Sequence, residues 1–326
     1  MWLNIVGPSV LLALGILVAP PAAVAQPTRT VARVGVLCSG SEARFLPPFR
    51  DGMRVLDSLE GRNAVIVVRA AEGVYDRLPR LVAELIDLNV DVIVTAGVPA
   101  ALAAQRATTT IPIVAASVGD PVGIGLVSTL ARPGGHITAL SHYAADLSAK
   151  QVEVFKQTIP TLARIGVLYN PTNPLHPGYW QETQAAAQAQ GLLLVRLEVR
   201  DTNELVHAFD AGGLERGDGL LVLSDALFNA QAARIAQLAT AHRLPMMAQY
   251  REFVEAGGLL AYGPNLPEIA KRAATYVDKI LKGTKAGDLP VEQPMQFELV
   301  MNLKAAQALG LTIPPALLFQ ATEVMQ

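Results

Sequence analysis

Small residues and side chains with hydroxyl, amide or carboxylate groups follow the apolar runs that the sequence predicts as strands. In the first half of the chain these positions hold Ser39, Gly40, Gly97, Val98 and Ser117. In the second half they hold two asparagines, a serine, a carboxylate and two tyrosines: Asn170, Asn173, Ser224, Asp225, Tyr250 and Tyr262. Hydroxyls, amides and single carboxylates at such places orient a small polar ligand by hydrogen bonds. This set of groups is suited to holding a ligand rather than to breaking covalent bonds.

Two aspartates among these loops could contact a ligand directly. Asp120 precedes Pro121, which is typical of a helix N-cap with proline at the first helical position. We therefore expect a helix from there to about Ala131, stopped by residues 133–135, and capping is favoured over ligand contact for Asp120. Asp225 follows a predicted strand, where it could pair with a ligand ammonium or cap the next helix. The sequence leaves both roles of Asp225 open.

Signatures of catalysis are missing from the sequence. There is no G-x-G-x-x-G after the first strand, no G-x-x-x-x-G-K-[ST] and no G-x-S-x-G. The histidines form no His-x-x-x-His pair, so we interpret them as scattered surface or capping residues: His136, His142, His176, His207 and His242. Cys38 ends a predicted buried strand and is interpreted as a small core residue. We expect no catalytic residue, no metal and no cofactor.

Aromatic residues are scarce, so any stacking on a ligand must use individual side chains. They make up 5% of the chain, and Trp180 stands beside Tyr179 just after the loop 170–177 that follows the predicted sixth strand. Tyr250 and Tyr262 follow two later strands. One or two of these rings could line a pocket, or they could pack at helix starts.

Short β-branched runs alternate with helical patterns along the chain. The predicted strands cover 33–38, 64–70, 90–96, 111–117 and 136–140, then 164–169, 192–199, 219–224, 245–249 and 258–262. Apolar residues at helical spacing lie between them, as at 78, 81, 82, 85 and 86. This alternation predicts two doubly wound lobes, each with a parallel sheet covered on both faces.

After the tenth strand the pattern does not start a third lobe. A helix over about 267–281, a connector, and the segments 297–302 and 303–310 are too few to fold alone. We expect an N-terminal lobe of 28–140 plus about 264–285. The C-terminal lobe is then 141–263 plus about 286–326, and several crossovers form a hinge between the lobes.

Composition and charge exclude several classes of protein. Of 326 residues, 51% are hydrophobic and 17% charged, so the chain can bury a large core. The formal net charge of −2 offers no basic excess, so no nucleic-acid partner is expected. The one cysteine excludes an intrachain disulfide.

The first 25 residues are typical of an export signal. An apolar run over 9–19 is followed by Pro20-Pro21 and by Ala23-x-Ala25, so cleavage after Ala25 is expected. The run is too short to span about 30 Å of hydrocarbon. The segment before it lacks Lys and Arg, unlike most signals. We predict a signal peptide at 1–25 and a periplasmic chain; a retained anchor is the alternative.

Several segments carry a family resemblance. "RVGVL", "IPIVAASVGDPVGIGLVSTLARPGGHIT", "RIGVLYNPTNP" and "REFVEAGGLLAYGPN" resemble ABC transporter substrate-binding proteins of the tryptophan/tyrosine-type group, and so does the ending from 274 to 315. The resemblance covers essentially all of 30–326. It implies a type I periplasmic-binding fold whose two lobes close on a ligand and deliver it to a membrane permease. The chain departs from the family at His136 and Ala139, near the first crossover, where asparagine and glycine are usual.

These observations predict a periplasmic solute-binding protein that feeds an ABC importer with a small polar ligand, such as an amino acid or related compound. Its partners would be the ligand and the permease subunits, and the protein would be a monomer. An exported sensing module of the same fold, without transport, is the alternative, and an enzyme with an unrecognised site is a third reading. The ligand is expected between the lobes, and an amino acid would place its ammonium on Asp225.

Overall fold

The computed structural model describes residues 31–56, 60, 62–142, 147–293 and 296–326. The predicted signal peptide lies outside the described residues. Within the described part of the chain, no helix has both the length and the apolar character needed to cross a membrane.

The first sheet has five parallel strands in the order β2-β1-β3-β4-β5. They are β1 (Ala32–Cys38), β2 (Ala64–Ala70), β3 (Val92–Ala96), β4 (Ile113–Val118) and β5 (Ile137–Ser141). The helices of this lobe are α1 (Leu46–Val55), α2 (Leu78–Asp87), α3 (Val98–Ala107) and the short turns η1 (Glu42–Arg44) and η2 (Tyr75–Arg77). Every residue of β4 is buried, as expected for a strand covered on both faces.

The second sheet has seven strands in the order β12-β11-β10-β9-β8-β6-β7. They are β6 (Arg164–Tyr169), β7 (Leu193–Glu198), β8 (Gly219–Val222), β9 (Met246–Ala248), β10 (Leu260–Pro264), β11 (Phe297–Asn302) and β12 (Glu323–Met325). Its helices are α4 (Leu147–Thr158), α5 (His176–Ala189), α6 (Glu204–Ala211), α7 (Ala226–Ala230), α8 (Ala232–Ala241), α9 (Arg251–Glu255), α11 (Leu303–Leu309) and α12 (Pro315–Gln320). Five strands, β7-β6-β8-β9-β10, repeat the order of the first sheet. The prediction of two doubly wound α/β lobes is confirmed.

One strand pair departs from the predicted parallel arrangement. β11 runs antiparallel to β10. The reason is the path of the chain: β10 leads at Pro264 into α10 (Leu266–Leu281), which packs on the first lobe. The chain therefore enters β11 from the first-lobe side and runs back in the opposite direction.

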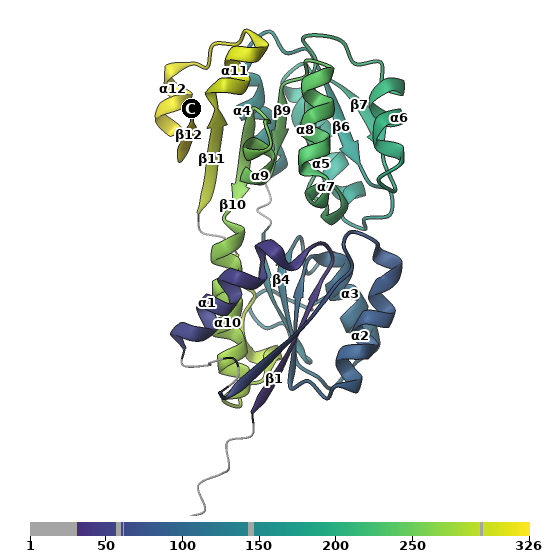
Figure 1. The fold of residues 1–326 in the computed structure, drawn as a ribbon, viewed down its shortest axis with the longest axis vertical. Helices are drawn as coiled ribbons and strands as arrows, with labels where there is room; N and C mark the ends of the chain where they lie inside the picture. Colours follow the sequence, from purple (N-terminus) through teal and green to yellow (C-terminus); the bar gives the residue numbers. More distant parts are fainter. Residues whose placement is uncertain (1–30, 57–59, 61, 143–146, 294–295) are drawn as a thin grey trace, which may run out of the picture. The chain divides into compact units, whose positions relative to one another are not determined.

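Helix α10 belongs by its contacts to the first lobe. It lies alongside α1 (Figure 1) and also packs on β3 and β4. Gly52 permits the close approach, because a Cβ there would lie 2.8 Å from the carbonyl oxygen of Lys271. The segment after it, including η3 (Ala286–Asp288), was expected in the second lobe from about 286. It instead packs against the first sheet, because Thr138 Oγ1 of β5 donates to the Leu289 carbonyl at 2.8 Å.

The helix predicted from Pro121 to about Ala131 is wrong, since this segment forms successive turns. Asp120 does cap locally, because its Oδ1 accepts from the Gly123 N–H at 2.9 Å. Two glycines explain the missing helix: Gly123 and Gly125 each disfavour one by about 1 kcal/mol. Gly125 also takes a left-handed φ of +70°, which ends the turn.

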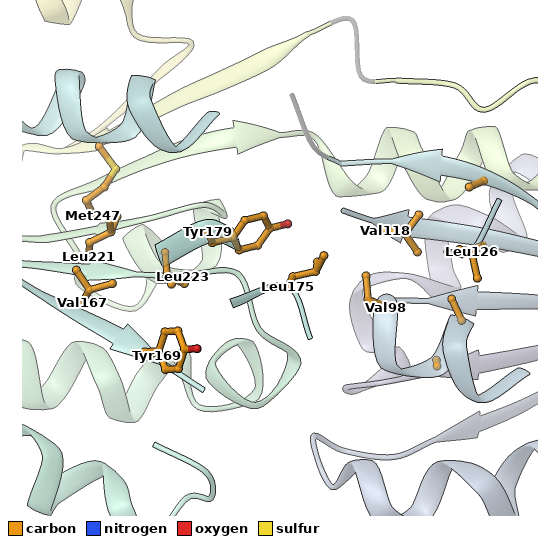
Figure 2. Packing of buried hydrophobic residues seen from close by; sticks show 14 of the residues in the cluster. Val98, Val118, Leu126, Val167, Tyr169, Leu175, Tyr179, Leu221, Leu223 and Met247 are labelled. Atoms are coloured by element: carbon orange, nitrogen blue, oxygen red, sulfur yellow. The ribbon is translucent and has the colours of Figure 1, made fainter. Parts of the chain in front are cut away.

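The largest apolar cluster includes residues of both lobes. Val98 and Val118 come from the first lobe, and Leu175 and Tyr179 from the second. Figure 2 shows Leu175 and Tyr179 between the second-sheet residues and this first-lobe pair. Gly119 allows the contact, because a Cβ at this position would lie 2.7 Å from Leu175 Cδ1. The two lobes are therefore in direct contact at this point, because residue 119 has no side chain to hold them apart.

Candidate functional site

A cavity of about 120 Å³ lies at the carboxyl ends of strands from both sheets. The first lobe lines it with Cys38, Ser39, Gly40, Ser41, Arg44, Phe45, Ala96, Gly97, Val98, Pro99, Ser117 and His142. The second lobe and α10 contribute Asn173, Leu175, Ser224, Asp225, Ala226, Asn229, Ala230, Tyr250 and Leu266. In open α/β sheets, ligands bind where the strand order reverses, between β1 and β3 in one sheet and β6 and β8 in the other. The cavity occupies both of these places.

The loops after β1 and β3 meet at the start of α3. Ser39 is fully buried, and its Oγ accepts from the Ala100 N–H at 2.9 Å. Gly97 takes a left-handed φ of +94°, and a Cβ on it would lie 2.9 Å from that oxygen. Only glycine allows this turn, which brings the N-terminal end of α3, with its partial positive charge, to the cavity wall.

Ser117 has an unusual backbone where it enters the cavity wall. Its φ is +52°, and the pairing of β4 with β5 shifts register between Ala116 and Val118. A left-handed conformation at a non-glycine residue costs about 1–3 kcal/mol, and such strain is concentrated at functional sites. The irregularity turns Ser117 toward His142, whose Nδ1 lies 3.4 Å from Ser117 Oγ.

His142 and Tyr250 connect the lobes through buried hydrogen bonds. His142 Nε2 lies 3.1 Å from the hydroxyl of Tyr179 in α5, and burial lowers the pKa of His142 to about 4. The imidazole is therefore neutral at pH 7. Burial raises the pKa of Tyr250, and its side-chain hydrogen bonds to Ser224 and Ser117 offset part of this rise.

The carboxylate of Asp225 is buried and surrounded by donors. Oδ1 accepts from the Tyr75 hydroxyl at 3.0 Å and from the Leu227 N–H at 2.8 Å. Oδ2 accepts from Asn170 Nδ2 at 3.2 Å and from Asn173 Nδ2 at 2.8 Å. A carboxylate offers about four acceptor positions, so these bonds fill it. Asp225 caps α7, one of the two roles left open, and the bond from Tyr75 crosses from one lobe to the other.

His176 fixes the loops behind the cavity. Its Nδ1 accepts from the Asn170 N–H at 2.7 Å, so Nε2 carries the proton and donates to the Ser224 carbonyl at 3.2 Å. Burial lowers the pKa of His176, which favours this neutral tautomer. His142 and His176 are thus buried and hold neighbouring loops in position by hydrogen bonds. The interpretation of the histidines as surface or capping residues is wrong for these two.

Two polar atoms of cavity-lining residues are buried with no hydrogen-bond partner among the described residues. They are Arg44 Nη1, in the turn after β1, and Asn229 Oδ1, in α7. The Nε of Arg44 lies 3.3 Å from Glu252 Oε1 of the second lobe, so one side of the guanidinium is already paired.

Comparison with known proteins agrees with this geometry. Residues 30–325 match the family model described as ABC transporter substrate binding protein. The chain belongs to the ABC transporter substrate-binding protein family. It is 25% identical over 252 residues to the tyrosine-binding protein of Clostridioides difficile, covering 77% of this chain and 72% of that one.

Two solved structures are similar to this substrate-binding protein over 90% of its length and the whole of theirs. One is a conserved domain protein from Vibrio cholerae, with 29% identity and a TM-score of 0.85. The other is an ABC domain from Streptococcus pneumonia in complex with L-Trp, with 26% identity and a TM-score of 0.82. The family consists of solute-binding components of ABC transporters.

The structure of this substrate-binding protein brings most of the predicted site residues together. The cavity wall contains Ser39, Gly40, Gly97, Val98, Ser117, Asn173, Ser224, Asp225 and Tyr250. Asn170 lies behind the wall and holds Asp225. Asp120 is exposed at its turn, and the Tyr262 ring stacks on Phe297 with centroids 5.8 Å apart. Neither Asp120 nor Tyr262 lines the cavity.

Among the lining residues that were not predicted as ligand contacts, three have side chains with nitrogen atoms: Arg44, His142 and Asn229. Arg44 had a usable signal, because it is a basic residue in the loop directly after the first strand. Asn229 lies one helical turn beyond Asp225. It is therefore not among the residues directly after a strand, which were the positions searched for ligand contacts. Trp180 is excluded from the wall, since its ring packs 4.5 Å from the Arg196 guanidinium carbon.

Proposed function

We propose that this member of the family is a periplasmic protein that captures a small polar solute between its two lobes and delivers it to the permease of an ABC importer. The observation that carries the proposal is the cavity at both strand-order reversals, with each lobe supplying part of its wall. Because only the closed form offers all contacts, solute binding and lobe closure are coupled.

The size of the cavity limits the solute. An engineered cavity of about 150 Å³ in another protein holds a benzene molecule. The cavity here, about 120 Å³, is in the same size class. It fits a compact solute, in the range of small amino acids and organic acids. One similar protein is named for tyrosine and the structure of another is in complex with L-Trp, so a screen should begin with amino acids and related compounds.

The chemistry of the wall supports binding without turnover. Burial, with smaller contributions from Glu42 and Glu72, raises the pKa of the Cys38 thiol to about 12, so the nucleophilic thiolate is not formed at neutral pH. Ser117 and His142 are neighbours, but a histidine with a pKa of about 4 is a poor general base at pH 7. We propose a non-enzymatic monomer that has no nucleic-acid partner, in keeping with its net charge of −2.

A thermal-shift screen over amino acids, small organic acids and nucleosides tests the proposal. A ligand at a hundred times its Kd adds about 2.7 kcal/mol to the free energy of unfolding. Ala226→Trp places a large ring in the cavity wall at a half-buried position and should abolish the shift. Ala241→Trp, at an exposed position outside that wall, is the control and should keep it. Chemical turnover of a bound compound, or equal shifts in both variants, would contradict the proposal.

A further inference from the structure

The two unpartnered atoms of cavity-lining residues differ in kind and come from different lobes. Arg44 Nη1 is a donor on a cation of the first lobe, and Asn229 Oδ1 is a neutral acceptor of the second lobe. Buried polar groups in folded proteins are almost always hydrogen-bonded, so each such exception calls for an explanation. Both residues line one cavity, so a single solute can contact both side chains; the two atoms themselves have almost no exposed surface in this conformation and must turn toward the solute to be satisfied.

The charge of the site favours an anion at Arg44. Glu252 Oε1 lies 3.3 Å from the Nε of the guanidinium, while Arg44 Nη1 and Glu252 Oε2 both remain buried without a partner among the described residues. Arginine presents its N–H groups as a planar fork that matches a carboxylate. The N-terminal end of α3 begins at the same wall and adds a partial positive charge.

Among the described residues that line this cavity, no carboxylate is free for a cation; the unpartnered Glu252 Oε2 lies beside Arg44 but outside the lining. Among the described lining residues, the acidic side chain is Asp225, and four donors fill its acceptor positions. A ligand ammonium would have to displace the Tyr75 hydroxyl or an asparagine amide from it. The acceptor that does remain, Asn229 Oδ1, is neutral and is matched by a hydroxyl as well as by an amine.

We propose that the solute is a small organic carboxylate, bound through its carboxylate by Arg44 and through a neutral donor such as a hydroxyl by Asn229. Its recognition requires no ammonium group, so a desamino acid binds at least as tightly as the matching amino acid. This inference rests on the proposed function and specifies the solute of that same cavity. Arg44 and Asn229 are its specificity-determining residues.

Calorimetric titration with matched pairs of compounds tests the carboxylate and the ammonium separately. The probes are 3-hydroxypropanoate against 3-hydroxypropanamide and the matching 2-amino acid serine, and a panel of other small desamino monocarboxylates, each against its carboxamide and its 2-amino acid. We expect acids to bind about tenfold to a hundredfold more tightly than amides, the range for a hydrogen bond to a charged group. Amino acids that bind tenfold more tightly than their desamino forms would overturn the inference and leave the proposed function intact. If no compound of either kind binds at millimolar concentration, the inference fails, while the proposed function is still decided by the wider thermal-shift screen.

Variants assign the two recognition roles. Arg44→Gln should reduce the acid-to-amide ratio of affinities to near one, whereas Glu252→Gln should preserve it. Because the ratio is measured within one variant, a general loss of structure affects acid and amide alike and does not imitate the result. Asn229→Asp should create a preference for amino acids over desamino acids. An unchanged ratio in Arg44→Gln, or no gain of amino-acid binding in Asn229→Asp, would contradict the assignment of that residue.

Discussion

The hydrogen bond from Tyr75 to Asp225 should contribute to lobe closure rather than to the folding of either lobe. The Tyr75 hydroxyl, in η2 of the first lobe, lies 3.0 Å from Asp225 Oδ1 at the start of α7. Burial, reinforced by Asp225, raises the pKa of this tyrosine, so it is the donor at every working pH. A hydrogen bond to a charged acceptor contributes about 1.5–3 kcal/mol.

Tyr75→Phe removes this one donor and keeps the ring. Asp225 Oδ1 retains the Leu227 N–H at 2.8 Å, so no acceptor is orphaned and the lower end of the range, about 1.5 kcal/mol, applies. Since 1.4 kcal/mol is a factor of ten, the Kd for the solute should rise about tenfold. The free energy of unfolding of the solute-free protein should change much less.

Titration calorimetry with the solute from the screen and urea unfolding without it measure the two quantities. Tyr276→Phe is the matched control, because its hydroxyl donates to the Pro290 carbonyl at 2.8 Å along the first lobe. The control should lose about 0.5–1.5 kcal/mol of stability and keep its affinity. If Tyr75→Phe instead keeps full affinity and loses the whole amount in unfolding, the bond belongs to the fold and the closure argument fails.

Three further predictions follow from the buried groups. Asp225→Asn should lower the free energy of unfolding by about 1–3 kcal/mol for each buried donor left unpaired, because the amide nitrogen that replaces Oδ2 cannot accept from Asn170 or Asn173; urea unfolding at pH 7 measures it, and a loss below about 1 kcal/mol would refute it. His142 has its pKa lowered by burial from 6.5 to about 4, so the unfolded chain binds more protons between these values, and stability should fall by about 3 kcal/mol as the pH drops from 7 to 4. In His142→Asn this part of the pH dependence should vanish, and an unchanged slope would be contrary evidence. Cys38, with a pKa near 12, should resist iodoacetamide in the native protein at pH 8 and react on unfolding; rapid native labelling would show an accessible thiolate.

The sequence predicts the strands well because most are short apolar runs, and central ones such as β4 are buried on both faces. β1, β2 and β6 match the predicted runs within a residue. The turns over 121–131 could not be separated from a helix, because capping at Asp120 looks the same in both. The reversal of β11 depends on where the chain re-enters the second sheet, which is a tertiary property that local patterning does not encode.

Site residues that come directly after a strand can be predicted from the sequence, because ligands of parallel sheets bind beyond the carboxyl ends of the strands. Ser39, Gly97 and Ser117 line the cavity for this reason. The saturation of Asp225 is not predictable, because its donors come from Tyr75, 150 residues away, and from the loop after β6. Sequence spacing shows which groups reach one edge of a sheet, but not which of them satisfy one another.

A crystal structure of the protein with the solute identified by the screen tests the central claim most directly. We expect the solute in the cavity, in contact both with the loops after β1 and β3 and with the loops after β6 and β8. A solute bound to one lobe alone, or at another surface of the protein, would contradict capture between the lobes.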